Sequence, residues 1–453
     1  MSSLESLGSK ALRKAEQFGA SQAEVFIMNT HGRSVYIENS SPRVADDKSE
    51  TGLSVKLCLG KRVGLSSGTV SEGSVDEIVN EALSIAKTTE EDPYFKSLPS
   101  GAKLSGRVEG TCSEETSQIG LEEIVAKAIT AVKAAEKTRN VKVPLGLIRL
   151  ADYSLHVVNS LGVNFSHKGT MVFTYFKSKA AAGSEAGEGI EKEWSTNIST
   201  VDFEKMGNSI AEKALSALKA ESFKEERKLT AVIVPVELEG LMSVVEFSTS
   251  AEQVNKKRSQ WTNKLGSVVA SEKLTVFDDG RYSGGVRSAL ADDEGVATGR
   301  KTIIDRGKLQ SYIYDSYNAG IAATKSTGNG FRRGTRSIEG AFAFPAGCSY
   351  ANMIVKPGNR SLDQIVSKID SGVLIENFAS PEVNPVTGGF GCEVRNAVLI
   401  EGGQLTKHVK HALLVGNMYE ALKNVYEVSN APKIVENTVL PHIAFSDITL
   451  LGE

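Results

Sequence analysis

The chain is 453 residues long, which is too long for one ordinary hydrophobic core and indicates two or three domains. Hydrophobic residues make up 40% of it and charged residues 24%, as is typical of a globular protein. The formal net charge of -3 gives no electrostatic reason to expect nucleic acid or an anionic membrane as the main partner. Any role connected with DNA would therefore be indirect.

The N-terminus and the cysteines bear on the cellular compartment. Residues 1–20 lack the apolar core of a signal peptide, and no apolar run approaches the roughly 18 residues that would span a bilayer. The cysteines lie far apart and form no Cys-x-x-Cys pair, which favours reduced thiols over a disulfide framework or a structural zinc site. They are Cys58, Cys112, Cys348 and Cys392. We expect a cytoplasmic protein with no membrane partner.

The first part of the chain alternates between helical and strand patterns. A helix is expected from Leu4 to about Phe18. Residues 23–67 alternate apolar and polar positions between turn signals, which indicates antiparallel strands. Helical spacing returns after Ser74, the predicted N-cap. Residues 92–117, rich in Pro, Gly, Ser and Thr, predict a long irregular connection.

A similar order of elements then recurs. Residues 121–138 predict the clearest helix of the chain, because apolar residues recur at i, i+3 and i+4. Residues 154–183 are hairpin-like, and a last helix is expected over 203–220. Two strand-rich units, each associated with helices, suggest a duplicated element within this N-terminal region.

The remainder of the chain is predicted to be mainly β. Short apolar runs alternate with glycine-rich turns, which favours a sheet, a sandwich or an open barrel with few helices. The fold class is therefore α+β, with an N-terminal strand-and-helix region over 1–228 and a mainly β region over 229–453. The first region can be subdivided near 92–117.

Residues 231–254 stand at the start of the second region. They predict a buried strand, a proline corner and an amphipathic helix. Metallohydrolases mount two histidines and a glutamate on such a helix, because ligands at helical spacing converge on one metal ion. This helix offers glutamates and no histidine. The glutamates are Glu237, Glu239, Glu246 and Glu252.

Three short motifs resemble chemical sites but lack the context that such sites need. His408 and His411 lie on a predicted strand with side chains on opposite faces, so they do not converge on a metal ion. Residues 64–68 match Gly-x-Ser-x-Gly, but no helix follows Ser66 directly, and a hairpin turn is the simpler interpretation. Residues 326–334 could cradle an anion, yet they lack phosphate-loop spacing. A loop that lets another backbone approach closely is favoured there.

Residues 384–405 place a glycine-rich loop before a strand. Glycines admit close backbone approach, and a neighbouring strand edge could pair with an extended peptide. The alternative is a tight hairpin.

Several separated motifs in this order resemble the TldD/PmbA family. In the second region they are the Asp-Asp-Gly at 278–280 and the segments 305–333 and 385–417. Residues 19–64 resemble the first domain of that family, so the resemblance covers nearly the whole chain.

The family has two branches that differ in the helix of residues 231–254. In the TldD branch this helix carries His-Glu-x-x-x-His, which binds zinc together with a cysteine near the C-terminus. By alignment on Gly240, the histidine positions are occupied here by Val244 and Thr249, and residues 428–453 contain no cysteine. Neither side chain is a useful zinc ligand. The chain therefore resembles the PmbA branch, also called TldE.

This resemblance implies a metal-free subunit of a heterodimeric metalloprotease that acts on unfolded or small peptides. No cofactor is expected in this chain, and zinc is expected in a TldD-type partner. The family's older description as modulators of DNA gyrase implies at most an indirect effect, without direct nucleic-acid binding. No catalytic residue is expected. The residues expected to position substrate are Thr387, Gly388, Gly389, Phe390, Thr327, Asn329 and Arg332.

Two alternatives stay open at this point. The chain could be a stand-alone hydrolase with an unrecognised site, which would cleave peptide without a partner. It could also be a homo-oligomeric peptide-binding module that binds peptide without cleaving it. A homodimer could also form when the chain is expressed alone.

Overall fold

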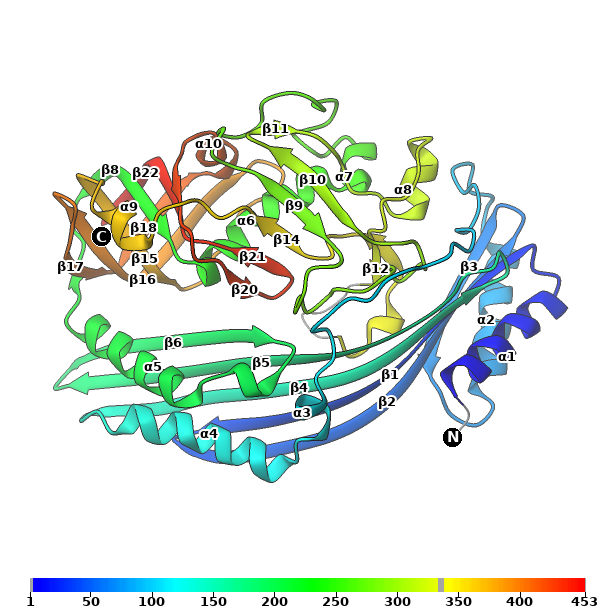
Figure 1. The fold of residues 1–453 in the computed structure, drawn as a ribbon, viewed down its shortest axis with the longest axis horizontal. Helices are drawn as coiled ribbons and strands as arrows, with labels where there is room; N and C mark the ends of the chain where they lie inside the picture. The colour runs from blue at the N-terminus through cyan, green and yellow to red at the C-terminus, as the bar shows by residue number, and fades with distance from the viewer. Residues whose placement is uncertain (1–2, 333–337, 453) are drawn as a thin grey trace.

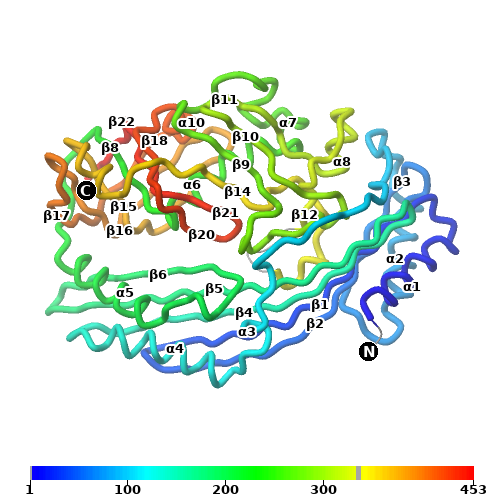
Figure 2. The backbone as a smooth tube through the Cα atoms, in the orientation of Figure 1, coloured from blue at the N-terminus to red at the C-terminus, as the bar shows by residue number. Residues whose placement is uncertain are grey.

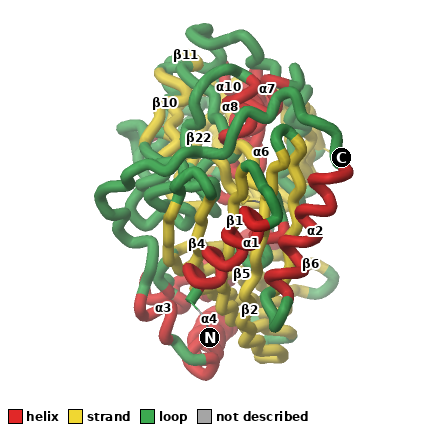
Figure 3. The backbone as a smooth tube through the Cα atoms, turned by 90° about the vertical axis from the view of Figure 1, so that its right-hand side faces the viewer, coloured by secondary structure: helices red, strands yellow, loops and turns green. Residues whose placement is uncertain are grey.

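The structure is a computed structural model that describes residues 3–332 and 338–452. A long, curved sheet carries helices on its outer face, and a mainly β C-terminal region lies against its concave face (Figure 1). Seen from the end of the molecule, the short helices of the C-terminal region are set among strands and loops (Figure 3). None of the helices in the described ranges is long and apolar enough to cross a membrane.

The N-terminal sheet has six strands in the described part of the chain, in the order β3-β2-β1-β4-β5-β6. All neighbouring strands are antiparallel. The strands are β1 (Gln22–Glu38), β2 (Ser41–Leu59), β3 (Arg62–Thr69), β4 (Val141–Asn159), β5 (Asn164–Ala182) and β6 (Glu185–Ser195).

The order helix, three strands, helix occurs twice in this region. The first unit is α1-β1-β2-β3-α2 and the second is α4-β4-β5-β6-α5, and β1 pairs with β4 where the units meet. The repeat agrees with the duplication suggested by the sequence. The helices are α1 (Leu4–Gln17), α2 (Ser74–Thr88), α3 (Glu114–Gln118), α4 (Leu121–Glu136), η1 (Ile198–Thr200) and α5 (Phe203–Leu218).

Strand alternation decides which side chains meet these helices. On the outer face, Ile148, Leu150, Val172 and Phe176 are buried against α4 and α5. Burial of each such side chain contributes roughly 1.5–3 kcal/mol. A second outer cluster packs β1 and β2 against α1 and α2. The irregular connection expected at 92–117 crosses the junction between the sheet and the C-terminal region before it reaches α3 (Figure 2).

Two local predictions in this region were wrong. Ser74 is the first residue of α2 and not its N-cap, because Gly73 takes the capping position in a left-handed conformation while the Ser74 hydroxyl bonds to Ser71. The Gly-x-Ser-x-Gly segment lies inside β3 and not in a hairpin turn. Its Gly64 is needed for packing, because a Cβ there would lie 2.0 Å from the Ala82 carbonyl oxygen of α2.

The C-terminal region contains a five-stranded barrel among its described residues. Strands β15-β8-β22-β18-β16 follow one another, and β15 also pairs with β16, which closes the ring. Strands β17 and β7 extend it, and β19 pairs with β22. The strands are β7 (Glu221–Ser222), β8 (Glu226–Ile233), β15 (Ser371–Phe378), β16 (Gly389–Glu401), β17 (Gln404–Lys410), β18 (Ala412–Asn417), β19 (Val425–Val428) and β22 (Ile443–Gly452).

A mixed sheet in the order β11-β10-β9-β14-β21-β20 lies beside this barrel, and β12 pairs with β13. The strands are β9 (Val276–Asp279), β10 (Arg300–Asp305), β11 (Lys308–Leu309), β12 (Gly330–Arg332), β13 (Ala346–Cys348), β14 (Met353–Val355), β20 (Lys433–Val435) and β21 (Thr438–Leu440). Apart from α6 (Pro235–Thr249), the described helices of the C-terminal region are short: α7 (Ala251–Asn255), α8 (Ser316–Ile321), η2 (Ala341–Ala343), α9 (Leu362–Val366) and α10 (Met418–Lys423). The predicted α+β class, with a mainly β second half, is confirmed.

Helix α6 (Pro235–Thr249) follows β8 through the predicted proline corner, with Pro235 as its first residue. Its apolar side chains join the core that the barrel and the mixed sheet share. The helix was predicted to continue to Val254, but it ends at Thr249. Ser250 is extended and bridges Ile313, and these tertiary contacts separate α6 from α7.

Candidate functional site

Val244 and Thr249, which the resemblance to the TldD/PmbA family aligns with zinc-binding histidines, lie inside the core on α6. Val244 is fully buried. The Thr249 hydroxyl lies 2.8 Å from the Tyr350 hydroxyl and donates to the Val245 carbonyl at 2.7 Å. Val245, next to Val244, is apolar and also buried. These positions therefore present no free donor atom of the kind that a zinc ion requires.

The glutamates of this helix segment do not converge on one point. Glu237 is buried and accepts hydrogen bonds of 3.1 Å from the Asn377 side chain and from the Phe378 N–H. Its burial raises the pKa of its carboxyl group. Glu246 accepts a hydrogen bond from the Ser349 hydroxyl at 2.5 Å. Each carboxylate thus fixes a different neighbouring segment to α6.

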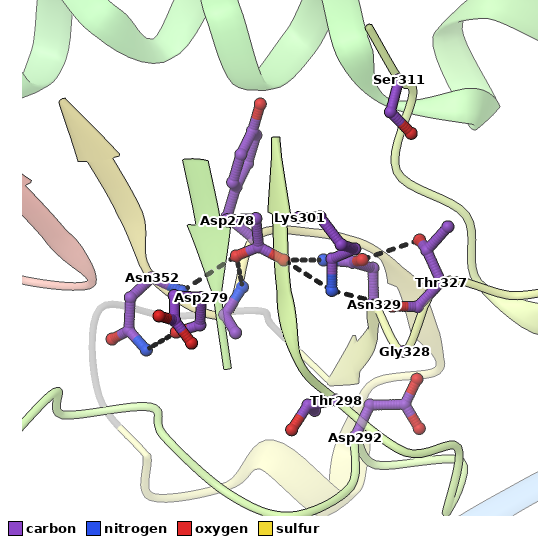
Figure 4. A network of polar contacts seen from close by, with 12 residues as sticks. Asp278, Asp279, Asp292, Thr298, Lys301, Ser311, Thr327, Gly328, Asn329 and Asn352 are labelled. Atoms are coloured by element: carbon purple, nitrogen blue, oxygen red, sulfur yellow. Dashed lines mark hydrogen bonds and ion pairs between the residues drawn. The ribbon is translucent and has the colours of Figure 1, made fainter. Parts of the chain in front are cut away.

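A buried polar network lies below α6 and centres on Asp278 (Figure 4). One carboxylate oxygen accepts hydrogen bonds from the N–H groups of Ala351 and Asn352 at 2.9 and 3.1 Å. The other accepts a hydrogen bond from the Asn329 amide at 2.7 Å and lies 3.1 Å from Lys301 Nζ. Burial raises the pKa of Asp278, and Lys301 and Asn329 oppose that shift.

Two of the residues predicted to position substrate belong to this network. Thr327 donates its hydroxyl hydrogen to the Asn329 side chain at 2.7 Å, and its carbonyl accepts a hydrogen bond of 2.8 Å from Lys301. Asn329 is buried and also donates to the Ser349 carbonyl at 2.8 Å. The close backbone approach expected in this loop is present, because a Cβ on Gly328 would lie 2.3 Å from a carbonyl oxygen.

Arg332 lies in a different environment, between the two regions. Its guanidinium donates to the Ser54 hydroxyl at 3.1 Å and to the Phe344 carbonyl at 2.9 Å, and it pairs with Glu24 at 3.2 Å. The group also stacks 4.6 Å from the centre of the Phe26 ring. Arg332 and Glu24 are both buried, so this contact joins the C-terminal region to the sheet.

The loop at 387–390 forms a separate group. Thr387 is exposed, whereas Phe390 is buried in the core. Gly388 has a φ of +79°, and a Cβ there would lie 2.4 Å from the Tyr419 ring, so only glycine fits. In the described ranges, no hydrogen bond joins Thr387 or its neighbours to Thr327, Asn329 or Arg332. Strand β16, which starts at Gly389, pairs with β15, β17 and β18 and does not offer the open edge considered above.

Several cavities lie where the sheet meets the C-terminal region, and two of them have several aromatic residues in their lining. The larger, of about 900 Å³, is bounded by β2, β3, the connection around 92–99 and helices α7 and α8. The second, of about 420 Å³, lies between the concave face of the sheet and the first turn of α6. Its floor includes Arg149, Phe173, Tyr175, Lys192 and Trp194. We refer to this second cavity as the concave cleft.

The concave cleft did not emerge from the sequence, although a signal for it exists. In β5, Phe173 and Tyr175 alternate with Val172 and Phe176, which are buried under the helices, and Trp194 of β6 is the cross-strand partner of Phe173. The cleft also depends on a close contact of α6. A Cβ on Gly240 would lie 2.2 Å from the Pro381 carbonyl oxygen at its rim.

Three models of the PmbA/TldA metallopeptidases match consecutive parts of the chain. Domain 1 matches residues 23–86, the central domain matches 114–218 and the C-terminal domain matches 226–452. The chain belongs to the PmbA/TldA metallopeptidase family. The resemblance to the TldD/PmbA family stated from the sequence is thereby confirmed.

Within the family, the likeness to PmbA and TldE proteins extends over nearly the whole chain. The crystal structure of TldE from Thermococcus kodakarensis has a TM-score of 0.89 at 25% identity and covers 98% of this chain and 100% of that one. The metalloprotease PmbA homolog of Buchnera aphidicola (Acyrthosiphon pisum) is 24% identical over 97% of this chain and 95% of its own length. The chain is thus a PmbA/TldE-like member of the family.

Other relatives match over part of the chain or in fold. The metalloprotease TldD homolog of the same Buchnera strain is 32% identical over 40% of this chain, and the match spans 36% of that protein's length. A Thermotoga maritima protein proposed to modulate a DNA gyrase shares the fold, with a TM-score of 0.88 at 21% identity over 99% of this chain and 100% of that one.

The metallopeptidase name of the family implies a metal ion, but the residues of α6 do not fit one. An apolar Val244 and a Thr249 hydroxyl that is already hydrogen-bonded stand at the aligned positions. Within residues 3–332 and 338–452, no three His, Cys, Asp or Glu side chains are grouped to hold a metal.

Proposed function

We propose that this chain is the noncatalytic, PmbA/TldE-type subunit of a heterodimeric metallopeptidase that acts on unfolded or small peptides. The observation that carries this proposal is the packing of α6. Val244 and Thr249, which the resemblance aligns with the zinc ligands, are buried core residues. Side chains packed in this way can support a chamber wall but cannot bind zinc without rearrangement of the core. Zinc is then expected in a TldD-type partner.

The comparison with known proteins supports this assignment in a second way. Similarity to a PmbA homolog and to TldE covers at least 95% of each chain, whereas the TldD homolog aligns over 36% of its length. On this proposal the present chain shapes the chamber and positions substrate. Of the residues predicted for positioning, Thr387 has the exposed side chain that could reach a substrate directly.

The decisive test measures zinc content and peptide cleavage for three samples: this chain alone, a TldD-type subunit alone, and the two mixed. An unstructured fluorogenic peptide is the substrate, and light scattering after size exclusion gives the stoichiometry. We expect no stoichiometric zinc and no cleavage by this chain alone, a one-to-one complex in the mixture, and cleavage that depends on both subunits.

The same samples separate the two alternatives. Stoichiometric zinc, or cleavage by the chain alone, would contradict the proposal and favour a stand-alone hydrolase. Peptide binding by a homo-oligomer, without cleavage in any mixture, would favour a binding module. A Thr387→Arg variant should lower cleavage in the mixture if its loop faces the chamber. Thr130→Arg, on an exposed position of α4, is the matched control and should leave cleavage unchanged.

A further inference from the structure

Two rows of side chains cross the concave face of β4, β5 and β6. The first row consists of Arg149, Phe173 and Trp194, which are direct cross-strand partners. In the next row Tyr175 is the partner of Lys192. Because strand residues alternate between faces, all five side chains point away from α4 and α5 and toward the C-terminal region.

These side chains are less buried than those near the other end of the concave face. Near the other end of the sheet, Phe26 and Met28 are buried against Phe342 of the C-terminal region. By contrast, Phe173 and Trp194 are half-buried and line the concave cleft, with their ring centres 5.1 Å apart. The two rings therefore leave apolar surface open to a cleft of about 420 Å³, within the range of about 300–1,000 Å³ usual for ligand sites.

The charges in the cleft favour an anionic ligand group. Glu239 and Glu436 line the cleft, and each already makes an interaction of its own. Among the described residues, neither Arg149 nor Lys192 forms a close ion pair: Lys192 acts on the Glu237 carboxyl only through its charge, and Arg149 donates to a tyrosine hydroxyl at 3.2 Å. The first turn of α6, which carries the positive end of its helix dipole, forms part of the opposite wall.

We propose that the concave cleft binds the C-terminal residue of a peptide when that residue is aromatic. The ligand ring would pack against Phe173 and Trp194, as aromatic pairs do at centroid distances of about 4.5–7 Å. Its terminal carboxylate would pair with Arg149 and Lys192, because charge-assisted hydrogen bonds to a carboxylate are the strong ones. The substrate class rests on the proposed function, since that function makes the ligand a peptide.

The chain carries its own reporter for this site. It has two tryptophans, of which Trp194 lines the cleft and Trp261 is 3% exposed in the core. Ligand binding at the cleft should change the emission of Trp194 and leave that of Trp261 unchanged. The Trp194→Phe variant isolates the core signal, and the difference from the native chain gives the cleft signal without any change to the core.

The experiment titrates the isolated chain with Ala-Ala-Ala-Phe and follows tryptophan emission. We expect a saturable change that is absent in Trp194→Phe, and at least tenfold weaker binding of the C-terminal amide or of Ala-Ala-Ala-Ala. Lys192→Gln should weaken binding of the free acid about tenfold and leave binding of the amide unchanged. Lys179→Gln, an exposed lysine of β5 outside the cleft, is the matched control and should change neither.

Three results would overturn the inference. They are no saturable change with the free acid, equal binding of acid and amide, or equal binding of an amidated peptide that carries Asp beside Phe. The last result would assign the carboxylate to a side chain. Because no partner is present, the outcome is independent of the proposed function. Cleavage restored by a partner without a Trp194 response would reject only the cleft site, and a response without cleavage in any mixture would reject only the subunit role.

Discussion

Replacement of Asp278 by asparagine tests whether the network below α6 holds the C-terminal region together. The asparagine side chain keeps the shape and one acceptor oxygen, so the bonds from Ala351 and Asn352 can persist. Its NH₂ group would face two other donors, the Asn329 amide and the Lys301 ammonium. Lys301 would then remain largely buried, with a side chain 16% exposed, and without a counter-charge.

The size of the effect follows from the burial of the pair. Removal of one partner of a buried ion pair costs about 3–5 kcal/mol, because the other charge stays uncompensated. Burial raises the pKa of Asp278, so desolvation already offsets part of the gain in the native protein, and the lower end of that range applies. For a unit the size of the C-terminal region, about 3 kcal/mol corresponds to a fall in melting temperature of about 6–12 °C.

Thermal unfolding followed by calorimetry and by far-ultraviolet circular dichroism measures this shift. The matched control is Asp279→Asn, because Asp279 is the next residue, is half-buried and accepts one backbone hydrogen bond of 2.9 Å from Arg281. We expect the control to change the melting temperature much less. Equal melting temperatures for the two variants would refute the idea that Asp278 is the centre of the network.

Three further changes probe other parts of the molecule. Gly240→Ala should destabilise the protein by about 1–3 kcal/mol, because the added methyl group would clash with a backbone carbonyl. Gly299→Ala is the control, since Gly299 has open space around it, and thermal melting should show no such destabilisation for that variant. Burial lowers the pKa of His167 to about 4, below its unfolded value of 6.5. The neutral imidazole therefore carries no penalty above pH 6.5. As the pH falls toward 4, the unfolded state takes up a proton that the folded state does not, and the free energy of unfolding falls by at most about 3 kcal/mol. The fall in melting temperature between pH 7.5 and pH 5 should be smaller for His167→Gln than for the native chain. Arg332→Met should cost about 3 kcal/mol in urea unfolding, the lower end of the range for a broken buried pair, because Glu24 stays buried with only Lys56, 3.8 Å away, as a counter-charge; Glu24→Gln should recover part of the loss. If Arg332→Met instead kept the stability of the native chain and bound peptide more weakly, a role of Arg332 in substrate binding would be supported.

The helices were the most predictable elements, because their apolar periodicity is a local property. The helix expected over 121–138 is present as α4, and that expected over 203–220 is present as α5. The helix predicted to reach Val254 was too long, since its end depends on Ile313, a residue more than 60 positions away. Local periodicity contains no information about such a contact.

Burial of individual polar residues was the least predictable property. The sequence places Arg332 in a glycine-rich loop, which suggests an exposed cation that could hold a ligand. The structure buries it beside Glu24, which lies 308 positions earlier in the chain. Pairing order in the sheet depends on distant contacts in the same way. The aromatic rows of β5 and β6 were within reach of the sequence, because strand alternation already separates Phe173 and Trp194 from the residues that pack under the helices.

Helix α6 shows why a metal site and a packed core compete for the same positions. A histidine that binds zinc must present a ring nitrogen to the ion and to a second hydrogen-bond partner, so its surroundings have to be polar. Val244 and Val245 instead lie in a cluster with Leu241 and Met242, where each fully buried aliphatic side chain stabilises the fold by roughly 1.5–3 kcal/mol. An imidazole in that cluster would be desolvated without a partner. On the proposed function, loss of the ligands therefore removes chemistry from α6 and adds to the packing that keeps the wall of the concave cleft in place.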